Sequence, residues 1–469
     1  MLNDSLAWIW RSRAYQNIIV IAILAGAGCL LWVASRREYW ARAWRQVRSN
    51  RLAMVCLLIL CMYIAVGLLD SISWSDASRG SDGELVHDSG GRVIYEPRAF
   101  SFLDRICTSL RERTEKTYSA PLATRLFSKE TLRTPDGRVV RDYPRLIYGG
   151  AHLDKEDDAT ADILRRIAIG LLIGLLVGIL TAGVIALTSS RRVRLRETET
   201  GGHGDSFTSS PRHRVSPSAI FWGLIAMAVA SLVAAVVLLA REYHVLGTDK
   251  VGNDVLYLAL KSVRTGLVIG GFTTALAVPF AIFFGVTAGY FGGRVDDIVQ
   301  YVYTTLASIP SILLIIAFML LFGRGLFNLC LIMGIAGWTR LCRLIRGETL
   351  KLRELEYVQA AKAFGVGRAR IIIRHIIPNL MHIVLISFLL RFSGLVLAEA
   401  LLSYLQIGVE PTRASWGRMI DLARMELARE PVVWWNLSAA FVFMVVLVLS
   451  ANLFGDAVRD ALDPRLRTE

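Results

Sequence analysis

Two ionisable side chains, Arg391 and Glu399, lie inside an otherwise apolar run at 383–402. On insertion scales, such a group costs about 2.5–3.5 kcal/mol at the centre of a membrane helix. The two residues are separated by about two helical turns, so both can face broadly the same side. One interpretation is that they line a route across the membrane or its outer gate. The other is that Glu399 is interfacial and Arg391 pairs with a neighbouring subunit.

The remaining polar residues give little sign of catalysis or metal binding. The seven histidines are scattered, and the six cysteines form no CxxC pair. Only Cys107 lies in a polar segment, so no disulfide framework is expected there. The sequence also lacks the G-x-x-x-x-G-K-[ST] phosphate cradle, so this chain is not itself expected to be an ATPase. We predict no catalytic residue, no metal and no cofactor in this chain.

The stretch 356–380, EYVQAAKAFGVGRARIIIRHIIPNL, is too polar to cross a bilayer and too ordered in pattern for a linker. Helical spacing places four side chains on one face: Tyr357, Ala360, Ala361 and Phe364. Gly365 and Gly367 should break this helix, and Pro378 should end the isoleucine-rich helix that follows. The result is a bent helical pair whose small-residue face would let another protein's backbone come close.

Basic side chains surround this helical pair. They are Arg340, Arg343, Arg346, Lys351, Arg353, Lys362, Arg368, Arg370 and Arg374, against the acidic Glu348, Glu354 and Glu356. Because Lys and Arg are enriched in cytoplasmic loops, we place the pair on the cytoplasmic side. A second interpretation is an amphipathic helix that rests on the lipid surface.

The chain is 54% hydrophobic, and nine apolar runs are candidates for crossing a bilayer. A spanning helix needs about 20 mostly apolar residues. The runs are 18–34, 52–69, 167–187, 219–240, 267–289, 303–322, 326–344, 383–402 and 432–454. We therefore predict an all-α polytopic membrane protein.

The arginines predict the orientation. Arg11 and Arg13 precede the first run, whereas six arginines follow it in the loop 35–51. This difference favours an N-terminus outside and, after nine crossings, a C-terminus in the cytoplasm. The net charge of +14 then reflects cytoplasmic loops and does not point to nucleic acid. A membrane-surface helix is expected at 38–50.

Residues 70–161 form a polar segment that this topology places outside the membrane. Strand-like runs flank a turn in GELVHDSGGRVIYEP and again in TLRTPDGRVVRDYP, and 100–113 has a helical pattern between them. The segment is therefore predicted to be a small α+β module. It either docks an extracytoplasmic partner or is a structural cap, and the sequence leaves both open.

Residues 162–240 should form a transmembrane helical pair joined by a basic loop. Small residues recur at every fourth position of its first helix: Gly170, Gly174, Gly178, Ala182 and Ala186. In lipid such a stripe lets two helices pack backbone to backbone, so this helix should lie against another span. The loop 188–217 is rich in Ser, Gly and Arg and is expected to be disordered.

The run HVLGTDKVGNDVL lies in the loop 241–266, which the topology places outside. Gly247 gives a turn, and Thr248 or Asp249 can cap a helix that runs through Val255 to Leu260. This loop is the candidate outer motif.

The later spans contain their own breakers. Kinks are expected at Pro279 and Pro310, and a tight turn at Gly292 and Gly293. The outer loop 403–420 carries glycine, proline and tryptophan and is expected to fold back toward the membrane.

Several ordered runs resemble the second membrane subunit of dipeptide and oligopeptide importers, which are ABC importers. They are HVLGTDKVGNDVL, AGYFGGRVDDIVQ, the stretch 356–378, LAEALLSYLQIGVEPTRASWGRMI and FGDAVRDALDPRLR. RSNRLAMVCLLIL at 48–60 resembles that family's first span. The resemblance covers about half the chain, 40–70 and 241–465. It implies a six-span permease core, to which this chain adds three spans and the outer module.

In that family, the counterpart of 356–378 is the "EAA" loop, a helix pair that docks into the ATP-binding subunits. Carried over by position, the resemblance assigns coupling to Glu356, Gln359, Ala360, Ala361, Gly365, Arg368 and Pro378. It assigns the outer motif to Gly247, Thr248, Asp249, Gly252 and Asp254. Gln359 replaces the family's acidic residue, which removes a charge that could pair with the ATPase.

The resemblance implies the permease subunit of an ABC importer in the prokaryotic inner membrane, with peptides as the usual cargo. Its partners would be a homologous second permease, two ATPase subunits that carry ATP and Mg, and an extracytoplasmic solute-binding protein. The domains are then 1–51 with an extra span and a basic loop, 52–69 as first core span, 70–161 as insertion, 162–240 as extra helical pair, and 241–469 as core with a coupling loop at 347–380.

Two other functions compete with this one. An ion-gradient-driven carrier would need several buried carboxylates or an inverted repeat, and neither is found. A membrane receptor that uses the outer module would need a cytoplasmic signalling domain, but the largest inner loop, 188–217, is short.

Overall fold

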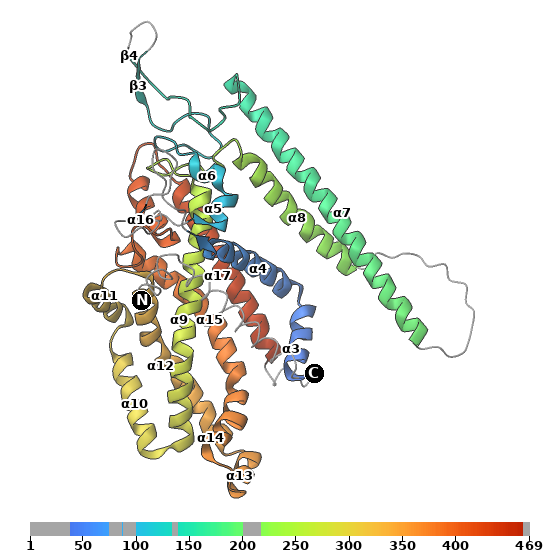
Figure 1. The fold of residues 1–469 in the computed structure, drawn as a ribbon, viewed down its shortest axis with the longest axis vertical. Coiled ribbons are helices and arrows are strands. Elements are labelled where there is room, and N and C mark those ends of the chain that lie inside the picture. Colours follow the sequence, from blue (N-terminus) through green and yellow to red (C-terminus); the bar gives the residue numbers. More distant parts are fainter. Residues whose placement is uncertain (1–37, 75–86, 88–99, 134–138, 200–216, 463–469) are drawn as a thin grey trace. The chain divides into compact units, whose positions relative to one another are not determined.

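The computed structural model describes residues 38–74, 87, 100–133, 139–199 and 217–462 (Figure 1). These divide into two compact units, which fall within 1–108 and 257–469 (unit 1) and within 109–256 (unit 2). The domain boundaries expected from the sequence stay predictions.

Long helices dominate both units. The described elements are α3 Glu38–Ser49, α4 Arg51–Ser71, β1 Ser73–Trp74, β2 Phe100–Ser101, α5 Phe102–Ile106, α6 Thr108–Glu112, β3 Glu130–Arg133, β4 Val139–Asp142, the 3-10 turn η1 Glu156–Asp158, α7 Ala159–Glu199, α8 Pro217–Ala240, α9 Val255–Phe291, α10 Gly293–Ser308, α11 Ser311–Phe322, α12 Leu326–Arg353, α13 Glu356–Ala363, α14 Arg368–Ile371, the π-helical turn η2 Ile372–Ile376, α15 Ile377–Tyr404, α16 Trp416–Leu427 and α17 Trp435–Leu462.

Seven described helices are long and apolar enough to cross a membrane, which confirms a polytopic helical membrane protein. They are α4, the first part of α7, α8, α9, α12, α15 with the turns before it, and α17. Each coincides with one of the predicted runs. The predicted run 18–34 lies outside the described residues.

The sequence predicted that 303–322 is one helix kinked at Pro310, and this prediction is wrong. The run is divided between α10 and α11, which are bent by 82° at a short break. Pro310 explains the break, because proline lacks an N–H and restricts the residue before it. Ile309 accordingly has extended backbone, with φ −84° and ψ 126°. The turn between α9 and α10 is as predicted, since Gly292 and Gly293 both have positive φ.

Unit 1 is held together by α4, α15 and α17, with α3 and α16 packed on them. Ala43 and Val47 on one face of α3 are buried against Val458 and Leu462 at the end of α17. This confirms the helix predicted at 38–50, and its contact with lipid stays a prediction.

The loop 403–420 folds back onto the helices of unit 1, as the sequence predicted. Ser415 caps α16 by accepting a hydrogen bond from the Arg418 N–H at 3.1 Å. Trp416 is 1% exposed, and its indole N–H donates to the Ala259 carbonyl of α9 at 3.1 Å. The tryptophan therefore fixes this loop against α9.

Two buried carboxylates tie the ends of α4 and α5 to α9 within unit 1. Lys261 of α9 donates to Asp104, and its Nζ lies 3.7 Å from Oδ1 of Asp70. Tyr257 donates to Asp104 at 2.6 Å, and Ser101 donates to Asp70 at 2.7 Å. Burial alone would raise the pKa of Asp104, but the hydrogen bonds from Lys261 and Tyr257 lower it.

In unit 2, α7 and α8 pack closely along the predicted glycine stripe. Three pairs meet there: Gly170 with Ala235, Gly174 with Ser231, and Gly178 with Met227. This confirms that α7 packs against another span. The disorder predicted for 188–217 is wrong for 188–199, which continue α7. Arg and Glu are good helix formers, so the end of a long helix can include them.

The polar part of unit 2 contains the second predicted hairpin. β3 pairs antiparallel with β4, and residues 134–138 between them lie outside the described set. The first predicted hairpin, at 83–97, also falls almost entirely outside it. The single helix expected at 100–113 is two short helices, α5 and α6, because α5 ends at Cys107.

A buried ion triad holds the polar part of unit 2 to the loop 247–254. Glu115 accepts backbone hydrogen bonds from Ile147 at 2.9 Å and from Tyr148 at 2.8 Å. His244 lies between two carboxylates, with Nε2 3.6 Å from Glu115 and Nδ1 2.8 Å from Asp254. All three charged side chains are nearly inaccessible to solvent, so the triad acts as one structural joint.

The α7–α8 contact leads to a test with a control in the same helix. A Cβ added at Gly174 would come within 2.6 Å of the Ser231 backbone nitrogen, whereas one added at Gly183 meets nothing within 4 Å. We expect Gly174→Leu to destabilise unit 2 by about 1–3 kcal/mol through overpacking. Gly183→Leu should have little effect. Thermal unfolding in detergent measures both, and equal losses would contradict this packing.

The triad predicts a pH dependence. Burial alone would lower the pKa of His244, but the hydrogen bond with Asp254 and the nearby Glu115 carboxylate raise it from 6.5 to about 9. Burial alone would raise the pKa of Glu115, but the nearby His244 and hydrogen bonds from three backbone N–H groups lower it from 4.5 to about 2. The His244 contribution is therefore complete below pH 6.5 and lost as the pH rises through 9; that of Glu115 is complete above pH 4.5 and lost toward pH 2.

Hydrogen exchange of residues 115–119, corrected for the intrinsic rate, should therefore show the highest protection between pH 4.5 and 6.5 and a decline toward pH 9. His244→Gln should remove the alkaline decline. Protection that stays constant up to pH 9.5 in the wild type would show that the triad is not charged as described.

Candidate functional site

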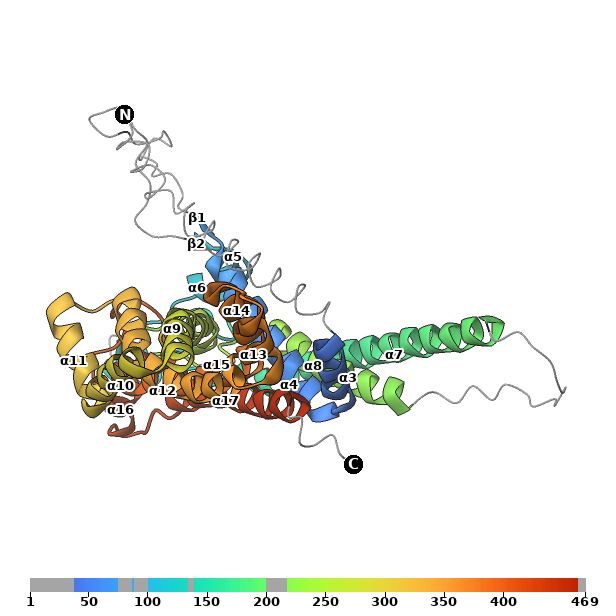
Figure 2. The same cartoon turned by 90° about the horizontal axis from the view of Figure 1, so that it is seen from below.

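The stretch 356–378, called the arm below, is a broken helical pair at one end of unit 1, next to the α9–α10 turn (Figures 1 and 2). Gly365 ends α13 with φ +75°, a conformation that an L side chain rarely adopts. The Val366 N–H donates to the Ala361 carbonyl at 3.1 Å and closes the turn. The break predicted from the glycines is confirmed.

The sequence predicted that Pro378 ends the second helix of the arm, and this prediction is wrong. The helix continues from Arg368 through η2 into α15, and Pro378 lies in the first turn of α15. There η2 makes a wider turn, in which the Ile377 N–H donates to the Ile372 carbonyl. A proline is tolerated in the first turn of a helix, because the N–H that it lacks has no partner there. The wider π-helical hydrogen bond just before Pro378 lets the backbone continue from η2 into α15. The arm is therefore continuous with a membrane-spanning helix.

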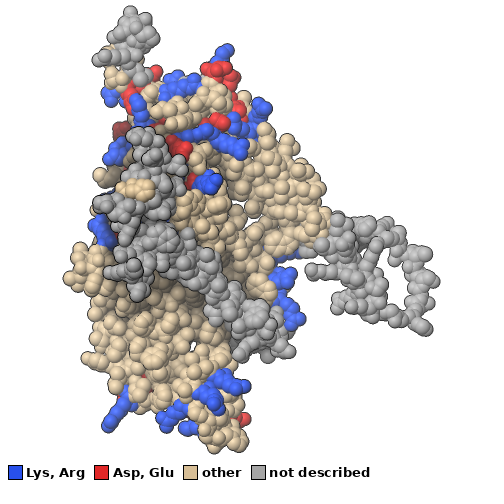
Figure 3. Space-filling view, viewed as in Figure 1, with Lys and Arg blue, Asp and Glu red and all other residues tan. Residues whose placement is uncertain are grey.

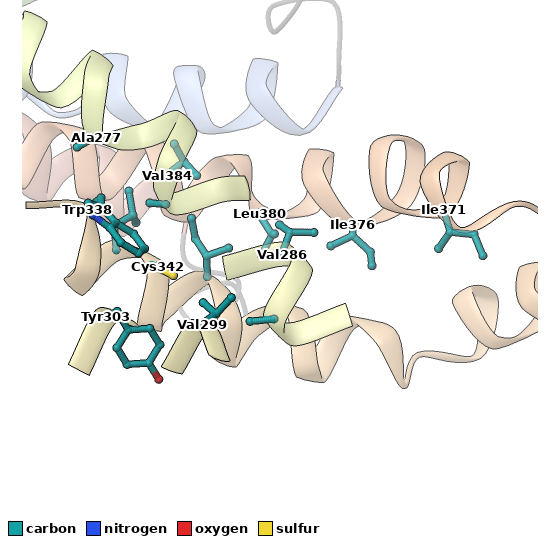
Figure 4. Close-up of a cluster of buried hydrophobic side chains, with 14 of the residues drawn as sticks. Ala277, Val286, Val299, Tyr303, Trp338, Cys342, Ile371, Ile376, Leu380 and Val384 are labelled. Atoms are coloured by element: carbon teal, nitrogen blue, oxygen red, sulfur yellow. The ribbon is translucent and has the colours of Figure 1, made fainter. Parts of the chain in front are cut away.

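One side of the arm is buried in the core of unit 1. Val358, Ile371 and Ile376 are at most 2% exposed and belong to the same cluster as Val286 of α9 and Cys342 of α12. Figure 4 shows this row of side chains between the helices. Tyr357 also accepts a hydrogen bond from Asn379 of α15 at 2.9 Å. The two halves of the arm are thus fixed to each other and to α15.

The opposite side of the arm is open and apolar at its tip. Phe364 is 87% exposed and Tyr357 is 44% exposed, and Ala360 lies between them on the same face. Lys and Arg side chains gather at this end of unit 1, beyond a broad band of uncharged residues (Figure 3). A shallow groove lies beside the tip, lined by Ala369, Arg370, Ile373, Arg374 and Pro378.

The other predicted coupling residues have contacts within the chain. Gln359 donates to the Arg353 carbonyl at 2.9 Å, so its amide faces the end of α12. The Arg368 guanidinium lies 6.0 Å from the Phe291 ring at the α9–α10 turn. Glu356 is exposed in the first turn of α13, where a carboxylate is favoured by the helix dipole.

The predicted outer-motif residues of the loop 247–254 are buried, and residues 115–119 pack on Thr248 and Gly252; Lys250 and Val251 at the loop tip are exposed. Thr248 is inaccessible to solvent, donates to the Thr117 carbonyl at 2.8 Å and accepts from the Ser119 N–H at 2.6 Å. Gly252 has φ +86°, and a Cβ there would collide with the Glu115 backbone. These contacts make the loop a structural socket within unit 2.

Neither Thr248 nor Asp249 caps the next helix, contrary to the sequence prediction. Asp249 instead accepts from the N–H groups of Val251 and Asn253, at 2.9 and 2.8 Å, which closes its own loop. α9 begins at Val255, directly after Asp254, the carboxylate that holds His244. Sequence analysis assigned no role to Glu115 or to His244, although His244 opens the run HVLGTDKVGNDVL.

Arg391 and Glu399 of α15 have different surroundings. Glu399 is 1% exposed and accepts a hydrogen bond from Ser403 at 2.7 Å. Arg391 is half-buried and donates to the Gly337 carbonyl of α12. Arg340 lies one turn along α12 from Gly337, so it neighbours this contact; the sequence analysis had grouped it only with the basic residues around the arm. In the part of the chain that the structure describes, no group of three or more His, Cys, Asp or Glu could hold a metal ion.

Two family models match this chain. The binding-protein-dependent transport system inner membrane component matches 281–468, which contains the arm, and the N-terminal TM domain of oligopeptide transport permease C matches 38–81. The solved structure of the inward-facing MetNI methionine ABC transporter is similar with 15% identity and a TM-score of 0.37, over 44% of this chain and 97% of that one.

Several named relatives are similar over about half of the chain. The oligopeptide transport system permease protein OppC of Bacillus subtilis is 34% identical over 224 residues, 48% of this chain and 72% of the relative. OppC of Haemophilus influenzae is 34% identical over 225 residues, 48% of this chain and 71% of the relative. The dipeptide permease DppC of Bacillus subtilis is 33% identical over 224 residues, 48% of this chain and 69% of the relative.

The family models and the named relatives confirm the family that the ordered motifs suggested. Together with the apolar helices, they make this chain a multi-pass inner-membrane protein, and the family is a membrane component of transport systems, not an enzyme family. The chain belongs to the oligopeptide and dipeptide transport permeases, the membrane subunits of ABC importers.

Proposed function

We propose that this permease carries peptides into the cell and forms half of a translocation pathway that a homologous second permease completes. The relatives support peptide cargo, because their names specify oligopeptide, dipeptide and glutathione transport. Two ATPase subunits bind ATP and Mg and drive the cycle, and an extracytoplasmic binding protein delivers the cargo.

The exposed tip of the arm is the observation that carries the coupling role. Phe364, Ala360 and Tyr357 together form an exposed apolar patch at the tip, with Phe364 87% exposed, and such a patch rimmed by polar residues is typical of a protein contact. Phe364 would enter a pocket of the ATPase, and Ala360 would allow close approach of its backbone. Lys362 and Arg368 on the rim would favour an acidic ATPase surface.

The buried side of the arm supports a mechanical connection to the pathway. The arm continues into α15 without a break, and Ile371 and Ile376 are packed between α9 and α12. Closure of the ATPase subunits on ATP would therefore displace α15 together with the arm. A rigid-body movement of this kind switches access between the two sides of the membrane.

The proposed topology places the arm in the cytoplasm and residues 109–158 outside. The socket supports a role for 109–158 in docking, since the predicted outer-motif residues of the loop 247–254 are buried and the binding protein would meet residues 109–158 beside the exposed loop tip. Its β3–β4 hairpin exposes Val139 and Val140, at 65% and 45%. Unit 2 thus adds to the permease core the outer α+β insertion and the extra helical pair α7–α8.

The arm predicts the effect of removing its exposed ring. Phe364→Ala should weaken ATPase binding roughly tenfold, because a central aromatic anchor is worth more than about 1.4 kcal/mol. Co-purification of the ATPase subunits and ATP-dependent uptake should both fall. Met425→Ala on α16, which is 69% exposed, is the matched control and should retain both. Undiminished co-purification of Phe364→Ala would refute the proposed contact.

Removal of the β3–β4 hairpin should impair docking of the binding protein without affecting the contact with the ATPase. Replacement of 130–142 by a short glycine-serine turn keeps Glu115 and its joint but removes the hairpin. We expect the binding-protein concentration for half-maximal uptake to rise roughly tenfold, with ATPase co-purification unchanged. If half-maximal uptake needed the same binding-protein concentration as in the wild type, the hairpin would be a structural cap with no part in docking.

A further inference from the structure

Two arginines lie in neighbouring predicted spans of unit 1. Arg340 lies four residues before the inner end of the run 326–344, and Arg391 lies eight residues after the start of the run 383–402. At 1.5 Å per residue, they are about 6 Å and about 12 Å inside those runs. Both positions therefore fall within a hydrocarbon core about 30 Å thick, with Arg340 nearer its cytoplasmic side. Arg391 is half-buried, and Arg340 is exposed on the surface of this chain.

A glycine makes the close approach of these helices possible. Arg391 donates to the Gly337 carbonyl, and a Cβ at Gly337 would collide with the Arg391 guanidinium. Arg340 lies three residues further along α12, and residues three apart are neighbours on a helix surface, so its charge lies next to the Gly337–Arg391 contact. The two cations are therefore brought together by the packing of α12 on α15.

Within the described residues, neither arginine forms an ion pair. The neighbouring arginines of α12 differ, since Arg346 is paired with Asp296 at 2.5 Å and Arg343 lies 5.2 Å from the Tyr303 ring. Glu399 is two turns beyond Arg391, about 12 Å along the helix, and is bonded to Ser403. The N–H groups of Arg391 that do not bind Gly337 are thus left with no counter-ion from this chain's described residues.

Unpaired charges in a membrane are costly, and two adjacent like charges are more so. Guanidinium groups bind carboxylates through two parallel hydrogen bonds, which makes such a pair a natural carboxylate site. A lipid phosphate is a poor candidate, because headgroups lie at the surfaces of the hydrocarbon core. A peptide, in contrast, must bring its own carboxylate through this depth.

We propose that Arg340 and Arg391 form a carboxylate-binding site inside the translocation pathway, and that its ligand is the C-terminal carboxylate of the transported peptide. This inference rests on the proposed peptide cargo and adds the group by which the permease recognises it. Gly337 provides the space, and Arg340 supplies the second charge. The site would hold the carboxylate while the peptide crosses the low-dielectric region.

The test compares trialanine with trialanine amide, which differ only in that carboxylate. The complete importer, with its ATPases and binding protein, is reconstituted in vesicles of a zwitterionic phospholipid, and ATP-dependent uptake of each peptide is measured. The wild type should favour the free acid by roughly tenfold or more, as expected for a charge-assisted hydrogen bond. Since the binding protein is the same throughout, any change in this ratio among variants comes from the permease.

Arg391→Gln and Arg340→Gln should each reduce the ratio toward one while amide uptake persists. Arg391→Lys should restore part of it, and Arg343→Gln is the control on the same helix that should keep it. An unchanged ratio in both glutamine variants would overturn the site. Loss of the second permease from purified Arg391→Gln would also overturn it, by locating the counter-ion in that subunit. A wild-type importer that transports neither peptide would contradict the peptide cargo itself.

Discussion

The continuous helix from Arg368 to Tyr404 is the constraint on which the rest of unit 1 depends. A helix transmits displacement along its axis only if its hydrogen bonds are unbroken and its side chains are packed. Next to Pro378, the helix is held by the hydrogen bond from the Ile377 N–H to the Ile372 carbonyl in η2. Ile371, Ile376 and Leu380 pack this part of the helix and are at most 1% exposed. The tip of the arm at Phe364 is exposed, whereas α15 at the other end is packed among the helices of unit 1.

The polar groups of this membrane protein are arranged by the cost of burying them. Asp70 and Asp104 are paired with Lys261, and Asp296 is paired with Arg346. In unit 2, one buried carboxylate, Glu115, serves both three backbone N–H groups and the histidine of the socket. Within the described residues, Arg340 and Arg391 are two cations at one contact between spans with no ion pair, which is why a ligand is inferred for them.

Much of the fold could be predicted because its signals are local. Apolar length located the spans, the glycine stripe of α7 predicted its packing, and Gly365 predicted the break in the arm. Three points could not be read locally. The effect of Pro378 depends on η2 before it, and the burial of Thr248 depends on Ser119, which is 129 residues away in the sequence. The depth of Arg340 depends on how far α12 continues past its apolar run.

The most direct measurement of the central claim is the number of peptides transported per ATP hydrolysed when the joint between arm and span is softened. We propose replacing Ile372 and Ile373 by glycine, which weakens the helix by about 1 kcal/mol per residue and leaves the exposed tip at Phe364 unchanged. The account predicts that the ATPase subunits still bind and hydrolyse ATP, while transport per ATP falls roughly tenfold or more. Transport per ATP equal to that of the wild type would contradict a rigid connection between the arm and α15.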